Sequence, residues 1–256
     1  MLYTQGEHGR AHAGATHARA LAHAAGDLEM IAQAEHLFGY VECALGNMNA
    51  ARDQFTHSAE GFRSLAIPWG TGYSLSGLAA VALATGNAGD AERLLDEAAS
   101  VLQRAGPWFM SLGRYMRAVM AVRRGNPDQA IMLVRESLTP IRKLHDAFAF
   151  VYTLVPLAAA VALKGDHAWA ARVLGARDAV IERTGITIVD PSVHDLREHA
   201  ERAARARLGA DRWARAYAAG RTASIDALLK DIDDASTELH RLRATSAAGS
   251  SKMREP

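Results

Sequence analysis

The chain has 256 residues, of which 49% are hydrophobic and 22% are charged, and its formal net charge is only +1. This composition is ordinary for a soluble globular or solenoid protein with enough material for a core, and the balanced charge does not suggest nucleic acid or an acidic membrane surface as a partner. Cys43 is the single cysteine, so an intrachain disulfide is excluded.

Residues 1–27 contain His, Arg and Glu, and they lack the apolar core of a secretory signal peptide. Gly6 precedes Gly46 by 40 residues, and Ala11, Ala15 and Ala22 follow it at the spacings of a repeat that continues through the chain. Residues 6–24 are therefore predicted to be the second helix of a partial repeat. We expect one of two situations: the chain is a C-terminal fragment of a longer regulator, or another chain covers this helix.

Residues 28–185 contain four copies of one pattern. Each copy has a glycine, Ala five residues later, and large apolar residues nine and sixteen residues later, whereas the residue seven before the glycine is small. The glycines are Gly46, Gly86, Gly125 and Gly165, so the period is 39 to 40 residues. Apolar positions at these separations share one helical face, and Gly followed by Asn or Asp ends one helix and caps the next.

Each copy is thus predicted to be an antiparallel helix pair that must stack on its neighbours to bury its apolar face. The predicted pairs are 28–44 with 48–65, 71–84 with 88–104, 109–123 with 128–144, and 147–163 with 168–184. Turns are predicted at 67–72, 105–108 and 145–146, and the glycine-containing segment 70–77 is interpreted as an inter-repeat turn. The uncharged run 147–163 has 17 residues and contains Pro156, so we interpret it as a buried helix, kinked at the proline, because a membrane span needs about 20 apolar residues.

The glycine turn, the following alanine, the large residue nine positions on and the small residue seven positions before resemble the tetratricopeptide repeat. The longer period is similar to that of the helical regions of MalT-like and other LuxR-type ATPase regulators from bacteria. This resemblance implies an all-α, right-handed α-solenoid. It also implies a cytoplasmic regulatory module, with a separate ATPase or DNA-binding domain as a possible partner.

Residues 186–232 are predicted to form a C-terminal helical cap, and its segments 193–209, 210–222 and 224–232 read as helices. The pattern from "AARVLGARDAVIERTG" to "LGADRWARAYAAGRTASIDALL" also resembles the end of those regulators' helical domains. Residues 233–256 are polar and Ser-rich, and we predict a disordered tail instead of the helix-turn-helix domain that usually follows. The sequence contains no P-loop motif.

In tetratricopeptide proteins the first helix of each pair lines the concave face. Transferring those columns to this chain, and adding two arginines in apolar columns, gives a candidate binding groove. Its residues are Gln33, His36, Tyr40, Tyr73, Ser76, Arg114, Tyr115, Arg117, Arg123 and Tyr152. Tyrosine suits an interface because it combines apolar area with a hydroxyl. Packing at helix edges would explain the same tyrosines.

Arg114 and Arg117 occupy columns that are apolar in other copies, so each must reach solvent or a partner. We interpret them as a local repacking, with an acidic ligand as the alternative. His8 and His12 share a helical face, but no carboxylate completes a metal site, and His36 and Cys43 stand too far apart on a helix for direct contact.

The sequence therefore predicts a non-catalytic interaction or sensor module without metal or cofactor. It would bind a peptide, a protein partner or a small effector. The alternative is a transcription regulator that contacts DNA through the Arg-rich C-terminal helices, although direct nucleic-acid binding is not expected from the overall charge.

Overall fold

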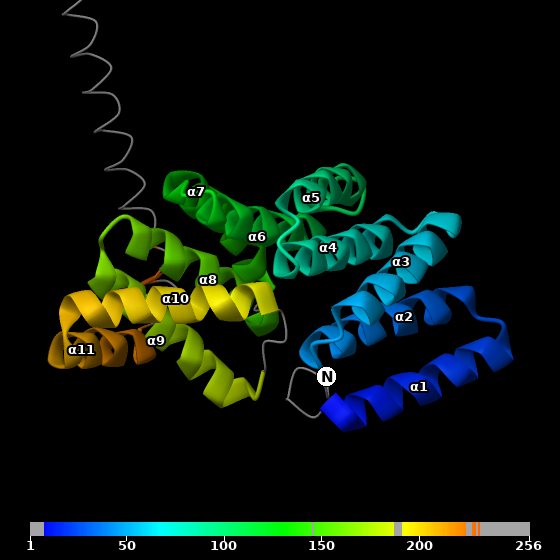
Figure 1. Ribbon diagram of the computed structural model, residues 1–256, viewed down its shortest axis with the longest axis horizontal. Helices are drawn as coiled ribbons and strands as arrows, with labels where there is room; N and C mark the ends of the chain where they lie inside the picture. The colour runs from blue at the N-terminus through cyan, green and yellow to red at the C-terminus, as the bar shows by residue number, and fades with distance from the viewer. Residues whose placement is uncertain (1–7, 145, 187–190, 224–226, 229, 231–256) are drawn as a thin grey trace, which may run out of the picture.

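The computed structural model describes residues 8–144, 146–186, 191–223, 227–228 and 230, and this part of the chain is helical, without a strand (Figure 1). The helices named in it are α1 His8–Ala25, α2 Leu28–Ala44, α3 Met48–Ser64, α4 Pro68–Ala84, α5 Ala88–Leu102, α6 Pro107–Arg123, α7 Pro127–Lys143, α8 Ala147–Leu163, α9 His167–Thr184, α10 Pro191–Leu208 and α11 Ala210–Arg221. The predicted tail 233–256 and most of the predicted helix 224–232 lie outside the described residues.

The turn chemistry predicted for the four glycines is confirmed. Gly46, Gly86, Gly125 and Gly165 all have positive φ, between 69° and 88°. An Asn or Asp side chain caps the helix that follows three of them, as when Asn126 Oδ1 accepts a hydrogen bond from the backbone N–H of Gln129. These turns place α2, α4, α6 and α8 as first helices and α3, α5, α7 and α9 as second helices of successive pairs.

The predicted bounds were wrong where proline begins a helix. α4 begins at Pro68 and α6 at Pro107, each with proline in the first turn, where its missing N–H costs no intrahelical bond. The segment 70–77 is therefore helix and not a turn. Its glycines serve close packing: a Cβ at Gly70 would lie 2.4 Å from the Phe62 ring, and a Cβ at Gly77 would lie 2.6 Å from Phe55.

Consecutive helices pack on one another along a row from α1 to α9, and most of the buried apolar side chains form one continuous core from α4 to the C-terminal helices (Figure 1). α8 is buried along residues 149–162, Pro156 included, and it remains helical through that proline. It contacts α6, α7, α9 and α10, which explains its uncharged sequence. None of the described helices is both long and apolar enough to cross a membrane.

The last two helices leave the row. α10 lies across α8 and contacts α9, α4 and α6 as well, whereas α11 packs closely on α9 (Figure 1). α10 buries one face, formed by Val193, Leu196, Ala200 and Ala204, against the core. The C-terminal cap therefore covers side chains of the first helices instead of only closing the end of the row.

Candidate binding surface

Aromatic rings from α2, α3, α4 and α6 form a connected group, here called the aromatic cluster. Its members are His36, Tyr40, Phe55, Phe62, Trp69, Tyr73, Trp108 and Phe109. His36 stacks on Tyr73 with ring centroids 6.3 Å apart, and Tyr73 lies 5.7 Å from Phe109. The structure thus brings His36, Tyr40 and Tyr73 of the predicted groove together.

The rings at the edge of this cluster are only half-buried, namely Tyr40, Trp69, Tyr73, Trp108 and Phe109, whereas Phe55 and Phe62 beneath them are fully buried. The cluster therefore has a packed base and a surface of partly accessible rings from three successive first helices. Such rings offer apolar area in a fixed geometry.

A chain of buried hydroxyls holds His36 in place. Ser74 Oγ lies 3.2 Å from His36 Nδ1 and 2.8 Å from Ser58 Oγ, and Ser58 Oγ donates to the Ala32 carbonyl at 2.8 Å. Burial lowers the pKa of His36 to about 4, so the imidazole is neutral near pH 7. Burial, with a smaller contribution from the Asp146 carboxylate, raises the pKa of Tyr73, so its phenol stays protonated.

Tyr115 and Tyr152 form a second, separate ring contact, with centroids 5.6 Å apart, and Phe148 packs on Tyr152 at 4.8 Å. Both tyrosines are buried, 6% and 3% exposed. They lie on α6 and α8, which α10 contacts. The C-terminal part of the predicted groove is therefore filled by the chain's own packing, and only the part around α2, α4 and the start of α6 presents half-buried rings.

The predicted arginines point elsewhere. Arg114 Nε lies 3.1 Å from Glu136 Oε2 of α7, and Arg117 pairs with Asp96 of α5. Together with Arg124, Arg117 lines a pocket of about 90 Å³ between α5, α6 and α7. These pairings agree with the repacking interpretation, because each guanidinium in an apolar column reaches an acidic neighbour. Arg123 is exposed at the end of α6.

The two remaining predicted residues make local hydrogen bonds. Gln33 is half-buried, and its Nε2 donates to Glu29 Oε1 one helical turn away at 3.2 Å. Ser76 is buried, and its hydroxyl donates to the Gly72 carbonyl at 2.9 Å within α4. Neither side chain joins the aromatic cluster through these hydrogen bonds.

The sequence reasoning missed Trp69, Trp108 and Phe109. A signal was present, because Trp69, Trp108 and Phe148 all stand 17 residues before their turn glycines. The first two directly follow the prolines that begin α4 and α6. The predicted helix starts fell after these residues, so they were read as turn.

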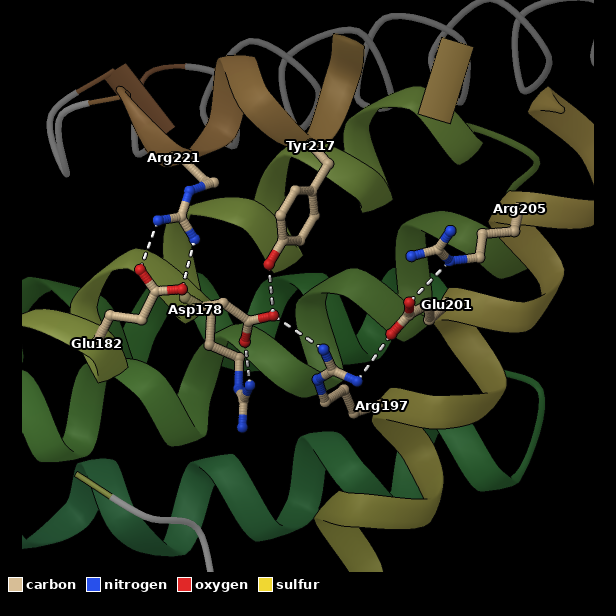
Figure 2. Close-up of polar contacts among 8 residues, drawn as sticks. Asp178, Glu182, Arg197, Glu201, Arg205, Tyr217 and Arg221 are labelled. Carbon is tan, nitrogen blue, oxygen red and sulfur yellow. Dashed lines mark hydrogen bonds and ion pairs between the residues drawn. The ribbon is translucent and has the colours of Figure 1, made fainter. Parts of the chain in front are cut away.

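A polar network fixes the C-terminal helices on α9 (Figure 2). Asp178 of α9 accepts hydrogen bonds from Arg197 of α10 at 2.8 Å and from the Tyr217 hydroxyl of α11 at 2.9 Å, and it also pairs with Arg177. One carboxylate thus joins three helices. Arg177 is only 6% exposed, and its burial lowers the pKa of the guanidinium.

Two further contacts extend this network toward the surface. Arg197 and Arg205 both bind Glu201 within α10, and Arg221 of α11 binds Glu182 of α9 with an Nη1–Oε1 distance of 2.8 Å (Figure 2). Arg205 also lies over the Trp213 ring at 4.5 Å. Three of the C-terminal arginines therefore hold the cap together.

The described residues contain no group of three His, Cys, Asp or Glu side chains that could hold a metal ion. Ser74 beside His36 does not provide an accessible nucleophile, because it is fully buried and its hydroxyl also contacts Ser58 and the Gly70 carbonyl. Cys43 is buried as well. The arrangement is suited to binding through rings and not to group transfer.

Comparison with known proteins gave no match: no family model, no curated protein and no solved structure is similar to this chain. The tetratricopeptide-like and MalT-like resemblance therefore remains a prediction from the sequence.

Proposed function

We propose that this protein is a non-catalytic interaction or sensor module of a bacterial regulatory protein, acting in the cytoplasm. It binds a peptide, a protein partner or a small effector at the aromatic cluster. The observation that carries this proposal is the row of half-buried rings Tyr40, Tyr73, Trp69, Trp108 and Phe109 across α2, α4 and α6. Tyrosine and tryptophan are enriched at the energetic centres of interfaces, where one ring both buries area and can bond a polar group.

The architecture that we propose with this function is a right-handed α-solenoid. In it, α2 to α9 are four tetratricopeptide-like pairs with a period of 39 to 40 residues, α1 is the second helix of a partial pair, and α10 and α11 are the cap. The positive φ at the four turn glycines supports this reading. A separate ATPase or DNA-binding domain is the kind of partner that the resemblance implies.

The alternative, DNA contact through α10 and α11, receives less support. Arg197, Arg205 and Arg221 are engaged with Glu201, Asp178 and Glu182 within the cap. An arginine that already neutralises a carboxylate releases fewer counterions from DNA. A gel-shift titration at low salt tests this alternative, since tight and steeply salt-dependent binding would favour it over the interaction module.

Tryptophan fluorescence tests the proposed site directly. Trp69 and Trp108 belong to the aromatic cluster, whereas Trp169 and Trp213 lie on α9 and α11. We expect a ligand found by screening short peptides and small bacterial metabolites to change the emission of the wild-type protein. The Trp108→Phe variant should lose most of that change, and the matched Trp169→Phe variant should keep it.

Binding should also weaken in Tyr73→Ala, whose ring links His36 to Phe109. Losing one well-placed ring at an interface costs on the order of 1–2 kcal/mol, which is about tenfold in affinity. If ligands of the protein shift the emission equally in Trp108→Phe and Trp169→Phe, the aromatic cluster is not the binding site.

A further inference from the structure

The free end of the helix row exposes more large apolar side chains than the rest of the described surface. Five of the eight that are exposed lie in α1, α2 and the residue that ends α2: Leu21, Leu28, Met30, Leu37 and Leu45. Leu21 is 58% exposed, Met30 44% and Leu37 38%. α1 itself buries only Ala15 and Ala22, and its main contact is with α2 (Figure 1).

Comparison of equivalent positions shows what α1 lacks. In the later second helices, the residue twelve positions after the turn glycine is buried: Ser58, Ala98 and Ser137 are 0% exposed, and Arg177 is 6% exposed. Ser58 and Ser137 each donate to a carbonyl of the first helix 26 residues earlier. The first helix of the same pair therefore covers this position. The equivalent in α1 is Ala18, which is only half-buried.

The same comparison applies to α2. Met30 and Leu37 correspond to Phe109 and Met116 in α6 and to Ala149 and Pro156 in α8. Phe109 packs on rings of the preceding first helix α4, and Met116 is 1% exposed. α1 and α2 thus form two sides of a site that has the position of one further first helix.

Charge indicates what kind of helix fits. The described α1 contains Arg10 and Arg19 with several histidines and no acidic residue, and α2, which packs on it, contains three Glu and no Lys or Arg. Arg19 pairs with Glu35 at 3.4 Å, and His12 lies 3.8 Å from Glu42. A second copy of α1 would oppose basic residues to basic residues, whereas an acidic helix would complement them.

We propose that this open end is a docking site for one acidic, amphipathic helix of a partner polypeptide, which lies where the first helix of a pair would lie. Gly14 and Ala18 of α1 allow close approach of the backbone, and Leu21, Met30 and Leu37 supply the apolar contact. The docking site rests on the repeat architecture of the proposed function but shares no residue with the aromatic cluster.

The test uses a fluorescent, helix-stapled peptide with the sequence of residues 28–44 and with Cys43→Ser, because α2 is itself an acidic first helix. Stapling is needed because an isolated helix of this length is marginal in water. We expect saturable binding to the full chain by fluorescence anisotropy. Leu21→Arg and Leu37→Arg should each weaken binding by about tenfold or more, as should replacing the three peptide Glu residues by Lys.

Matched controls are Leu144→Arg and Leu163→Arg, since these leucines are 60% and 52% exposed elsewhere on the chain. They should leave peptide binding unchanged. Leu21→Gln tests the same contact with a smaller perturbation, and equal melting temperatures establish that the variants are folded. Absence of peptide binding, or equal binding by Leu21→Arg and Leu144→Arg, overturns the docking site.

Sedimentation of the protein alone distinguishes the other occupant. A concentration-dependent dimer that Leu21→Arg abolishes would assign the face to a second copy and overturn the partner helix. Failure of the docking site is separable from failure of the proposed function, because the tryptophan response of the aromatic cluster is measured with other ligands and other variants.

Discussion

At the scale of single residues, Asp178 carries the strongest energetic prediction. Its carboxylate is bound by Arg177, Arg197 and Tyr217 from three helices (Figure 2). Removing one member of a buried ion pair leaves the other charge uncompensated, at a cost of about 3–5 kcal/mol. We expect Asp178→Ala to lower the free energy of unfolding by an amount toward the lower end of this range, since Arg197 is partly solvated.

The matched control is Glu182→Ala, one turn further along α9. Its pair with Arg221 is exposed, so the change should cost less than about 1 kcal/mol. Urea unfolding of the three proteins measures both effects. Equal losses for Asp178→Ala and Glu182→Ala would contradict a buried role for the Asp178 network.

His36 gives a pH prediction. Its pKa is lowered to about 4 by burial, whereas the unfolded value is about 6.5. Between these values the unfolded chain binds a proton that the folded chain excludes, so stability falls as the pH decreases from about 6.5 toward 4. The full loss is at most about 3 kcal/mol and is smaller where solvent reaches the ring.

The measurement is the free energy of unfolding of wild type and His36→Gln at several pH values. The difference between the two proteins should shrink as the pH falls from 6.5 to 4, because only the wild type loses this contribution. Parallel curves over that range would show that His36 is not held neutral by the Ser74 and Tyr73 environment.

At the scale of helices, the sequence predicted turns better than helix starts. The glycine columns specify positive φ, which few other residues adopt, so Gly46 and Gly125 could be assigned from spacing alone. The starts of α4 and α6 could not, because Pro68 and Pro107 read equally well as turn residues or as first-turn helix residues. That ambiguity concealed Trp69 and Trp108, and with them much of the aromatic cluster.

The contact between α9 and α11 depends on two glycines. A Cβ at Gly175 would lie 2.1 Å from the Tyr217 carbonyl oxygen, and a Cβ at Gly220 would lie 1.9 Å from that of Arg172. Both obstacles are backbone, which cannot rotate away. We expect Gly175→Ala to displace α11, with a loss in the free energy of unfolding of about 1–3 kcal/mol from overpacking.

The control for this steric effect is Gly89→Ala in the first turn of α5, where nothing lies within 4 Å of the added Cβ. That change should leave stability unchanged or raise it by up to about 1 kcal/mol through helix propensity. Thermal unfolding compares the two variants, and hydrogen exchange across 210–221 locates the change. Unaltered protection of α11 in Gly175→Ala would contradict the close crossing.

At the scale of the whole molecule, the position of α10 separates the predicted groove from the candidate site. The apolar face of α10 is readable in the sequence as Val193, Leu196, Ala200 and Ala204. Its docking on α8, with further contacts to α4 and α6, depends on long-range packing that no local pattern encodes. Tyr152 therefore lies buried, while Tyr73, in the same column of the repeat, remains half-buried.

The arrangement also predicts how local stability varies along the chain. α1 buries only two alanines and packs mainly on α2, whereas α8 is buried over 149–162 and contacts four helices. Amide hydrogens exchange through local opening, whose free energy follows the apolar contact that must be broken. We therefore expect α1 to be the least protected helix of the row from α1 to α9, and α8 to be among the most protected.

Hydrogen exchange of the free monomer, followed by mass spectrometry at several times, measures this order. The docking peptide should slow exchange in α1 and α2 and leave α6 and α8 unchanged, because it covers only Leu21, Met30, Leu37 and their neighbours. If α1 in the free monomer is as protected as α4 or α8, its second face is already covered, and neither the partial pair nor the open end describes this molecule.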